Sequence, residues 1–131
     1  MRPDTASKRI LAVDDNPYIL RIVSRVLESA GFHVLTATSG HEALRVIERC
    51  GLPDLALVDL NMPGMDGWTF SQALREVSDL PIIVLTALGD EQRVIKSVEK
   101  FADDCIFKPF HPNDLIARIR RVLLRVDDLT C

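Results

Sequence analysis

Five short β-type segments, each followed by a segment with helical spacing, constrain the fold of this chain more than any other feature. They are Lys8–Asp14, His33–Thr38, Leu55–Val58, Ile82–Leu85 and Cys105–Phe107. Four are nearly continuous apolar runs, which are typical of strands covered on both faces, and the second alternates like a half-buried strand near a sheet edge. Strands that alternate with helices predict one parallel sheet with helices on both faces, an α/β fold.

Helix-start signals support this division of the chain. Asn16 and Pro17 form a good N-cap and first helical residue, and Gly31 is placed to end the helix that they begin. Ser39 and Glu42 have capping-box spacing, which predicts that Ser39 accepts from the Glu42 backbone N–H while the Glu42 carboxylate reaches back. The first two helices are therefore expected to begin at these residues.

Length, charge and cysteine usage narrow the class of protein. The 131 residues suit a single domain, expected to span 1–131 with a core of about 8–126 and with 127–131 as a tail or the start of a linker to an absent output domain. The net charge of −3 argues against direct nucleic-acid binding. No apolar run approaches the roughly 20 residues of a membrane helix. The three cysteines, Cys50, Cys105 and Cys131, have no C-x-x-C pair, which favours a reducing cytoplasmic location over a disulfide or zinc protein.

Polar side chains stand at the carboxyl ends of four predicted strands. Asp14 and Asp15 follow the first, Asp59 the third, Thr86 the fourth and Lys108 the fifth. Singly, each has an ordinary explanation, such as a turn former, a strand residue or a surface charge. Together they converge where open parallel sheets bind ligands, and clustered carboxylates repel one another unless a cation neutralises them. Oxygen ligands favour Mg²⁺, and the ammonium and hydroxyl suit phosphoryl oxygens, so the pattern predicts a Mg²⁺-dependent aspartyl phosphate.

Four stretches of the chain resemble the receiver domains of bacterial two-component response regulators. They are Ile10–Asn16, Leu57–Gly67, Ile83–Ala87 and Ala102–Phe110. The resemblance covers residues 8 to about 126. It implies a flavodoxin-like, doubly wound, five-stranded parallel sheet of order 2-1-3-4-5 with five helices.

The resemblance also implies a role for each site residue. Asp59 would accept the phosphoryl group, and Thr86 and Lys108 would bind its oxygens. A cis Lys108–Pro109 peptide would aim the ammonium over this edge of the sheet. Mg²⁺ would be held by Asp15 directly, Asp14 through water, the Asp59 carboxylate and the backbone carbonyl of Asn61.

A receiver domain of this kind implies a signalling switch rather than an enzyme acting on other substrates. The phosphoryl group would come from the phosphohistidine of a sensor histidine kinase or a phosphotransfer protein, and phosphorylation would change the face formed by the fourth helix, fifth strand and fifth helix. The only catalysis expected is the domain's own phosphorylation and dephosphorylation. The kinase is expected to dock on the first helix around Tyr18, Arg21, Ile22 and Arg25.

Three positions depart from the family pattern. Cys105 replaces the usual aromatic residue three positions before the lysine, so the output face is expected to respond through backbone or loop shifts. Phe101 replaces a glycine, so the fourth helix should end differently, with Phe101 packing near Phe107 or Phe110. Leu88, an apolar residue two positions after the threonine, should shield the acyl phosphate from water and prolong its lifetime.

The last helix suggests a possible homodimer. Arg118, Arg121 and Arg125 share one helical face, and Glu99, Asp103 and Asp104 precede them in the sequence. A solvated helix face is the simpler interpretation of these arginines. Alternatively, the acidic and basic groups are self-complementary across a two-fold axis, giving a dimer on phosphorylation.

Three other functions are alternatives to that of a receiver domain. A phosphatase with an aspartate nucleophile would have a second acidic residue where Asn61 stands. A flavin site would not place Asp14 and Asp15 in the loop that cradles a phosphate. A phosphorylation-independent interaction module with the same fold stays the main alternative, although it would be expected to lose one or more of the five site residues.

Overall fold

The computed structural model describes residues 7–60, 62, 66–87, 89 and 91–130, with the side chains of 127–130 left out. The strands are β1 (Arg9–Val13), β2 (His33–Ala37), β3 (Leu55–Asp59), β4 (Ile82–Ala87) and β5 (Asp104–Lys108). The helices are α1 (Pro17–Ser29), α2 (Gly40–Cys50), α3 (Gly67–Val77), α4 (Glu91–Lys100) and α5 (Pro112–Thr130). The five predicted strands and five predicted helices are confirmed, and α5 continues beyond residue 126.

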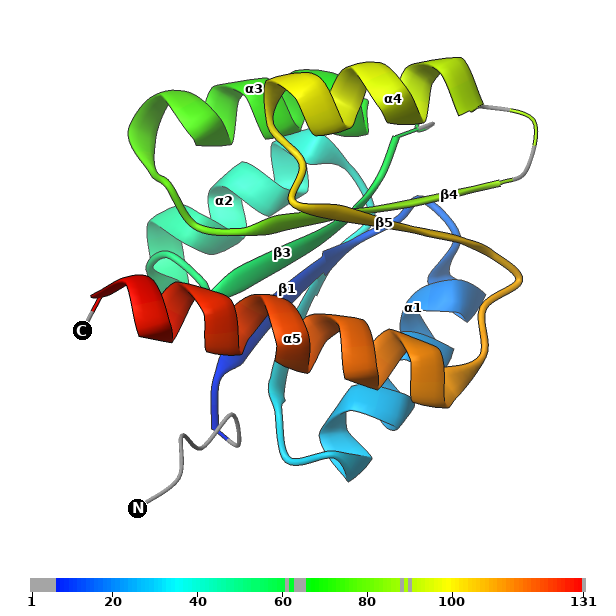
Figure 1. Ribbon diagram of the computed structural model, residues 1–131, viewed down its shortest axis with the longest axis vertical. Coiled ribbons are helices and arrows are strands. Elements are labelled where there is room, and N and C mark those ends of the chain that lie inside the picture. The colour runs from blue at the N-terminus through cyan, green and yellow to red at the C-terminus, as the bar shows by residue number, and fades with distance from the viewer. Residues whose placement is uncertain (1–6, 61, 63–65, 88, 90, 131) are drawn as a thin grey trace.

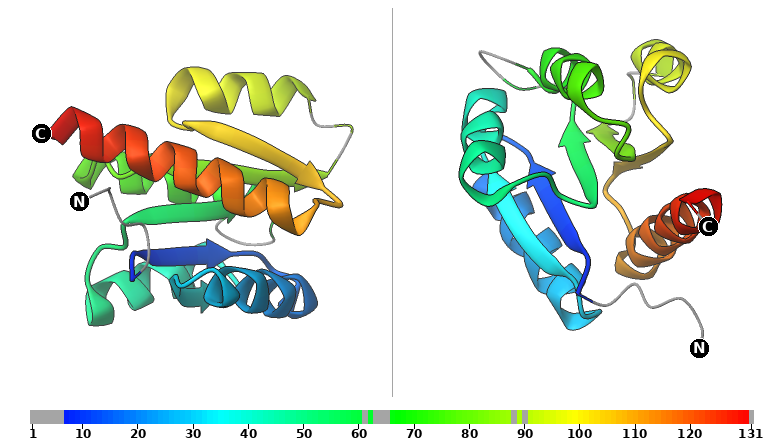
Figure 2. Two further views of the ribbon diagram at one scale, coloured as in Figure 1. Left: turned by 60° about the horizontal axis from the view of Figure 1, so that its bottom comes forward. Right: turned by 90° about the vertical axis from the view of Figure 1, so that its left-hand side faces the viewer.

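The five strands form one parallel sheet in the order β2-β1-β3-β4-β5. This is the flavodoxin-like order that the motifs implied. Figures 1 and 2 show α1 and α5 on one face of the sheet and α2, α3 and α4 on the other. β2 lies at the edge and is only partly buried, as its alternating sequence predicts, whereas every residue of β3 is buried.

Two apolar cores separate along the two sides of the sheet because alternate strand residues point to opposite faces. On the α1 and α5 side, Ile10 and Ala12 pack with helix residues such as Leu27 and Ile119. On the other side, the neighbouring residues of β1 pack with α2 and α3. No helix in the described part of the chain is long and apolar enough to cross a membrane.

The predicted helix starts are confirmed in their main contacts. Asn16 Oδ1 accepts from the Tyr18 N–H at 2.9 Å, with Pro17 as the first residue of α1. Ser39 Oγ accepts from the Glu42 N–H at 3.1 Å. The Glu42 carboxylate accepts from the Thr38 hydroxyl at 3.1 Å, one residue before the partner that the capping box predicts.

Phe101 does not pack near Phe110, one of the two partners predicted for it, and its packing near Phe107 stays a prediction. Phe101 is buried on the α2–α3 side of the sheet, where its ring meets Trp68 edge-on with the centroids 5.1 Å apart. Phe110 packs into the core on the opposite face. α4 does end without a left-handed residue at this position, since Ser7 is the only non-glycine with positive φ among the described residues.

Candidate functional site

The sheet brings the predicted site residues to one edge. Asp14 and Asp15 directly follow β1, Asp59 ends β3, Thr86 lies next to the end of β4 and Lys108 ends β5. Because β1, β3, β4 and β5 are adjacent and parallel, their carboxyl ends meet along the same side of the domain. The juxtaposition expected from the sequence therefore exists.

Three carboxylates form the centre of the site. One oxygen from each of Asp14, Asp15 and Asp59 lies within 4.8 Å of the others. Asp14 and Asp59 are only 1% and 5% exposed, so water screens their mutual repulsion weakly, whereas Asp15 faces solvent. Like charges this close favour a cation between or beside them.

Lys108 supplies one such cation. Its Nζ lies 2.8 Å from Asp14 Oδ2 and 3.2 Å from Asp59 Oδ2. Burial alone would lower the pKa of the ammonium, but the hydrogen bond and charge of Asp14, followed by those of Asp59, outweigh it and raise the pKa above its usual value. Lys108 is therefore charged at neutral pH and is placed beside the Asp59 carboxylate. The Lys108–Pro109 peptide is cis, as the family resemblance implied.

The turn after β1 holds the first carboxylate in place. Asp14 Oδ1 accepts from the Asn16 N–H at 2.9 Å, and the Asp14 N–H donates to the Ala37 carbonyl of β2 at 3.1 Å. Together these bonds fix both ends of the residue. The same turn leaves Asp15 exposed, where its carboxylate is accessible from outside the domain.

The remaining predicted site positions differ in how much the structure says about them. Thr86 is fully buried and pairs with Phe107 across the β4–β5 ladder. Asn61 and Leu88 lie outside the described residues, so the carbonyl ligand and the shielding of an acyl phosphate stay predictions.

Gly67 is a site-forming residue that the sequence reasoning did not single out. A Cβ atom at this position would lie 1.7 Å from the Asp59 carbonyl oxygen and 2.6 Å from its carbonyl carbon. The first turn of α3 therefore rests directly on the backbone of Asp59. The glycine stands at the end of one of the matching motifs, which is the signal that could have identified it.

The donor set suits a hard divalent cation. The described ligands are all carboxylate oxygens, and Mg²⁺ prefers oxygen donors and usually retains several waters. An exposed carboxylate beside two buried ones gives such an ion both charge compensation and access to water. The residues present therefore fit the metal that the sequence predicts.

Cys105 behaves as a small, partly buried side chain. Burial raises the pKa of its thiol, the Asp104 carboxylate raises it further, and Arg118 opposes them. A raised pKa keeps the thiol protonated and disfavours thiolate chemistry. Cys105 packs at the edge of the α2–α3 core, as a small apolar residue does.

The parallel sheet, with an acidic cluster and a lysine at its carboxyl edge, places this chain among the doubly wound α/β domains that bind ligands at that edge. The family profile of the response regulator receiver domain matches residues 10–120. The chain belongs to this receiver domain family of two-component systems.

Curated relatives and solved structures agree with this assignment. The chain is 46% identical over 127 residues to the probable transcriptional regulator ycf27 of Porphyra purpurea, covering 97% of this chain and 52% of that protein. It is 41% identical to the DNA-binding response regulator MtrA of Mycolicibacterium smegmatis, over 95% of this chain and 54% of that protein. The chain thus spans about half the length of these relatives.

Two solved structures show the same fold. A response regulator receiver domain protein of Clostridium thermocellum superimposes with a TM-score of 0.87 at 31% identity, over 93% of this chain and 98% of that one. A CheY-like receiver domain protein of Methanospirillum hungatei gives a TM-score of 0.85 at 31% identity, over 94% and 98%.

Proposed function

We propose that this domain is a phosphorylation-activated switch that accepts a phosphoryl group on Asp59. The observation that carries the proposal is the position of Asp59, whose carboxylate shares one site with two further aspartates and lies 3.2 Å from the Lys108 ammonium. A carboxylate that attacks a phosphoryl group needs cations to stabilise the charge on the equatorial oxygens. The site provides a fixed ammonium and a place for a metal.

The chain's own residues divide the work of the transfer. Asp59 is the nucleophile, and its carboxylate oxygen forms the new bond to phosphorus as the bond from phosphorus to the donor's histidine nitrogen breaks. The Lys108 ammonium and the Thr86 hydroxyl bind the phosphoryl oxygens. Asp14, Asp15 and Asp59, with the Asn61 carbonyl, are the proposed ligands of Mg²⁺, which supplies further neutralisation of the phosphoryl charge when bound.

Acetyl phosphate with Mg²⁺ tests the proposal directly. Intact mass spectrometry should show the gain of one phosphoryl group on the wild-type protein and no gain on Asp59→Asn, because an amide cannot form the acyl phosphate. Asp79→Asn is the matched control, since Asp79 is an exposed aspartate outside the site and should be labelled like the wild type. Equal labelling of Asp59→Asn would move the acceptor elsewhere. No labelling of the wild type would favour the interaction module.

The proposed donors are a sensor histidine kinase or a phosphotransfer protein. The first helix begins two residues after the acidic turn, and it presents Tyr18, Arg21 and Arg25 to solvent, with Ile22 partly buried. Tyr18 is 64% exposed, an unusually open position for an aromatic side chain. These features support docking of the donor on α1, next to Asp59.

We further propose that phosphorylation promotes a homodimer through α4, β5 and α5. Arg118 and Arg121 already have a partner within the chain, because Asp104 binds Arg118 at 3.2 Å and Arg121 at 2.9 Å. Asp103 is not part of this set, because it lies 3.6 Å from Arg75 of α3. What favours an interface is the apolar outer face of α4, where Ile95 and Val98 are 58% and 48% exposed.

A charge on that outer face should abolish the dimer without harming the fold. With the phosphoryl mimic beryllofluoride, Ile95→Glu should weaken dimerisation by at least about 10-fold, since a buried unpaired carboxylate costs well over 1.4 kcal/mol. Light scattering after size-exclusion chromatography measures the mass. Val77→Glu is the control, because Val77 is 74% exposed at the end of α3. A dimer that survives Ile95→Glu would contradict this proposal.

Three further expectations from the sequence are also proposals. The domain's chemistry is proposed to be confined to its own Asp59, so that it is no enzyme for other substrates. Its compartment is proposed to be the cytoplasm. Direct DNA contact is not proposed for this domain, because its net charge is −3 and its described site is acidic.

A further inference from the structure

The structure fastens α4 to α3 through a small set of side chains. On the α3 side these are Asp66, Trp68 and Arg75, and on the α4 side Arg93 and the adjoining Phe101. We call this set the α3–α4 brace. The Arg93 guanidinium lies 5.7 Å from the centre of the Trp68 ring, and its Nη2 lies 3.5 Å from Asp66 Oδ2. The Phe101 ring meets the same indole edge-on at 5.1 Å.

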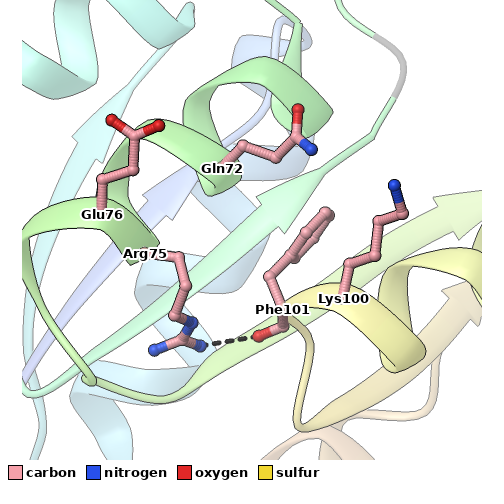
Figure 3. A pocket seen from close by; sticks show the side chains of 5 residues that line it. All are labelled: Gln72, Arg75, Glu76, Lys100 and Phe101. Carbon is pink, nitrogen blue, oxygen red and sulfur yellow. Dashed lines mark hydrogen bonds between the residues drawn. The ribbon is translucent and has the colours of Figure 1, made fainter.

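The brace engages α4 at both of its ends. Arg93 lies in the first turn of α4 and Phe101 directly follows its last residue, and the single indole of Trp68 contacts both. At the far end, Arg75 donates to the Phe101 carbonyl at 2.6 Å, as Figure 3 shows. Arg75 also donates to the Leu80 carbonyl at 2.8 Å, which anchors its guanidinium to the α3–β4 connection.

Beside the brace, a pocket separates part of α4 from α3. A pocket of about 240 Å³ lies between the two helices, lined by Gln72, Arg75, Glu76, Lys100 and Phe101. The pocket lining is mainly charged and polar, and the side chains that α4 buries are Val94 and Ser97. Because α4 buries few side chains, the brace contacts contribute substantially to where the helix rests against α3.

The residue next to Trp68 in the chain, Gly67, touches the proposed phosphoacceptor. Gly67 rests on the Asp59 carbonyl so closely that a Cβ atom would lie 1.7 Å from it, and Trp68 is the next residue in the chain. A shift of the Asp59 backbone is thus passed to the first turn of α3 and to the indole. This route to α4 does not pass through Cys105.

We propose that the α3–α4 brace holds α4 in its resting position and couples that position to the state of Asp59, with Trp68 and Arg93 as positioning residues. The proposal rests on the proposed function, since it requires that Asp59 be modified. Because the brace stabilises the resting form, weakening it favours the activated form, and binding at Asp59 must tighten by the same factor. A cation–π contact of this exposure corresponds to a factor of roughly 2 to 5.

Beryllofluoride titration in the presence of Mg²⁺ measures this coupling. Trp68 is the single tryptophan, so its fluorescence reports the titration without interference. Arg93→Gln should tighten beryllofluoride binding by roughly 2- to 5-fold. Phe101→Leu, which keeps a buried apolar side chain but removes the ring contact, should act in the same direction. Lys96→Gln removes a charge from the exposed side of α4 and should bind like the wild type.

The outcomes separate the brace from the proposed function. If Arg93 had a merely structural role, Arg93→Gln would lower the stability of the domain without tightening the binding of beryllofluoride. If only the loss of a positive charge near the site mattered, Arg93→Gln would weaken the binding of beryllofluoride. Unchanged or weaker binding by both Arg93→Gln and Phe101→Leu would therefore overturn the brace and leave the proposed function intact. A wild-type protein that shows no response, and no phosphoryl adduct with acetyl phosphate, would overturn both.

Discussion

Replacing Lys108 by glutamine should destabilise the metal-free protein by about 3 kcal/mol. The Lys108 ammonium lies 2.8 Å from Asp14 and 3.2 Å from Asp59, and both carboxylates are buried. Without it, the two charges face each other with less compensation in a region that water screens weakly. The cost is that of leaving buried charges unpaired, and it exceeds the value of an exposed ion pair.

Urea unfolding with and without Mg²⁺ measures this effect. A metal at about tenfold its dissociation constant adds about 1.4 kcal/mol to any form that binds it. Mg²⁺ should therefore make Lys108→Gln more stable than the same variant without metal. Lys96→Gln, an exposed lysine on α4, should change the stability little. Equal stability of Lys108→Gln and the wild type in the absence of metal would contradict the coupling of the ammonium to the two carboxylates.

The same ion pairs give a pH dependence of known sign. The folded-state pKa of Lys108 is raised above the ordinary value of 10.5, so its stabilising contribution is complete below that pH. It is lost as the pH rises above 10.5 through the folded-state pKa. The stability difference between the wild type and Lys108→Gln should therefore be constant from pH 8 to 10 and shrink in stronger alkali.

Most of the fold and the centre of the site could be predicted because both follow from local patterns plus one topological rule. Continuous apolar runs identify the buried strands, and the alternation of His33–Ala37 identifies the edge strand. Once strands and helices alternate, parallel order puts every carboxyl end on one side of the sheet. The proximity of Asp14, Asp59 and Lys108 then follows from the strand order alone.

What could not be predicted depends on contacts between segments that no local pattern relates. The sequence shows that Phe101 is not glycine, but the choice of Trp68 as its partner depends on how α3 and α4 pack. Apolar periodicity likewise does not reveal that Ile95 is 58% exposed, because the same spacing occurs on buried and on exposed helix faces. The sequence also allows Arg118 to pair with a second copy of the chain, but in the structure it pairs with Asp104 at the start of β5.

Gly67→Ala should have a large effect for the addition of a single methyl group. The new Cβ would lie 1.7 Å from the Asp59 carbonyl oxygen and 2.9 Å from Val58 Cγ1, so the start of α3 or the end of β3 must shift. Overpacking of this kind costs about 3 kcal/mol, although alanine itself favours a helix. Because the shift falls on the backbone of the proposed nucleophile, a displacement of about 1 Å should slow phosphorylation roughly 100-fold.

Urea unfolding and the rate of labelling by acetyl phosphate measure the two effects separately. Gly51→Ala is the matched control: its φ of +87° makes alanine strained, but the nearest atom to the new Cβ is Arg9 Nη1 at 3.8 Å. With its ψ of 174°, that variant should lose about 1–3 kcal/mol from backbone strain and keep the wild-type labelling rate. Gly67→Ala could lose stability and still be labelled as fast as Gly51→Ala. In that case α3 shifts and Asp59 stays in place, so the contact does not position the Asp59 nucleophile. A loss of rate beyond the loss of folded protein would instead show that the contact between Gly67 and Asp59 sets the geometry of the nucleophile.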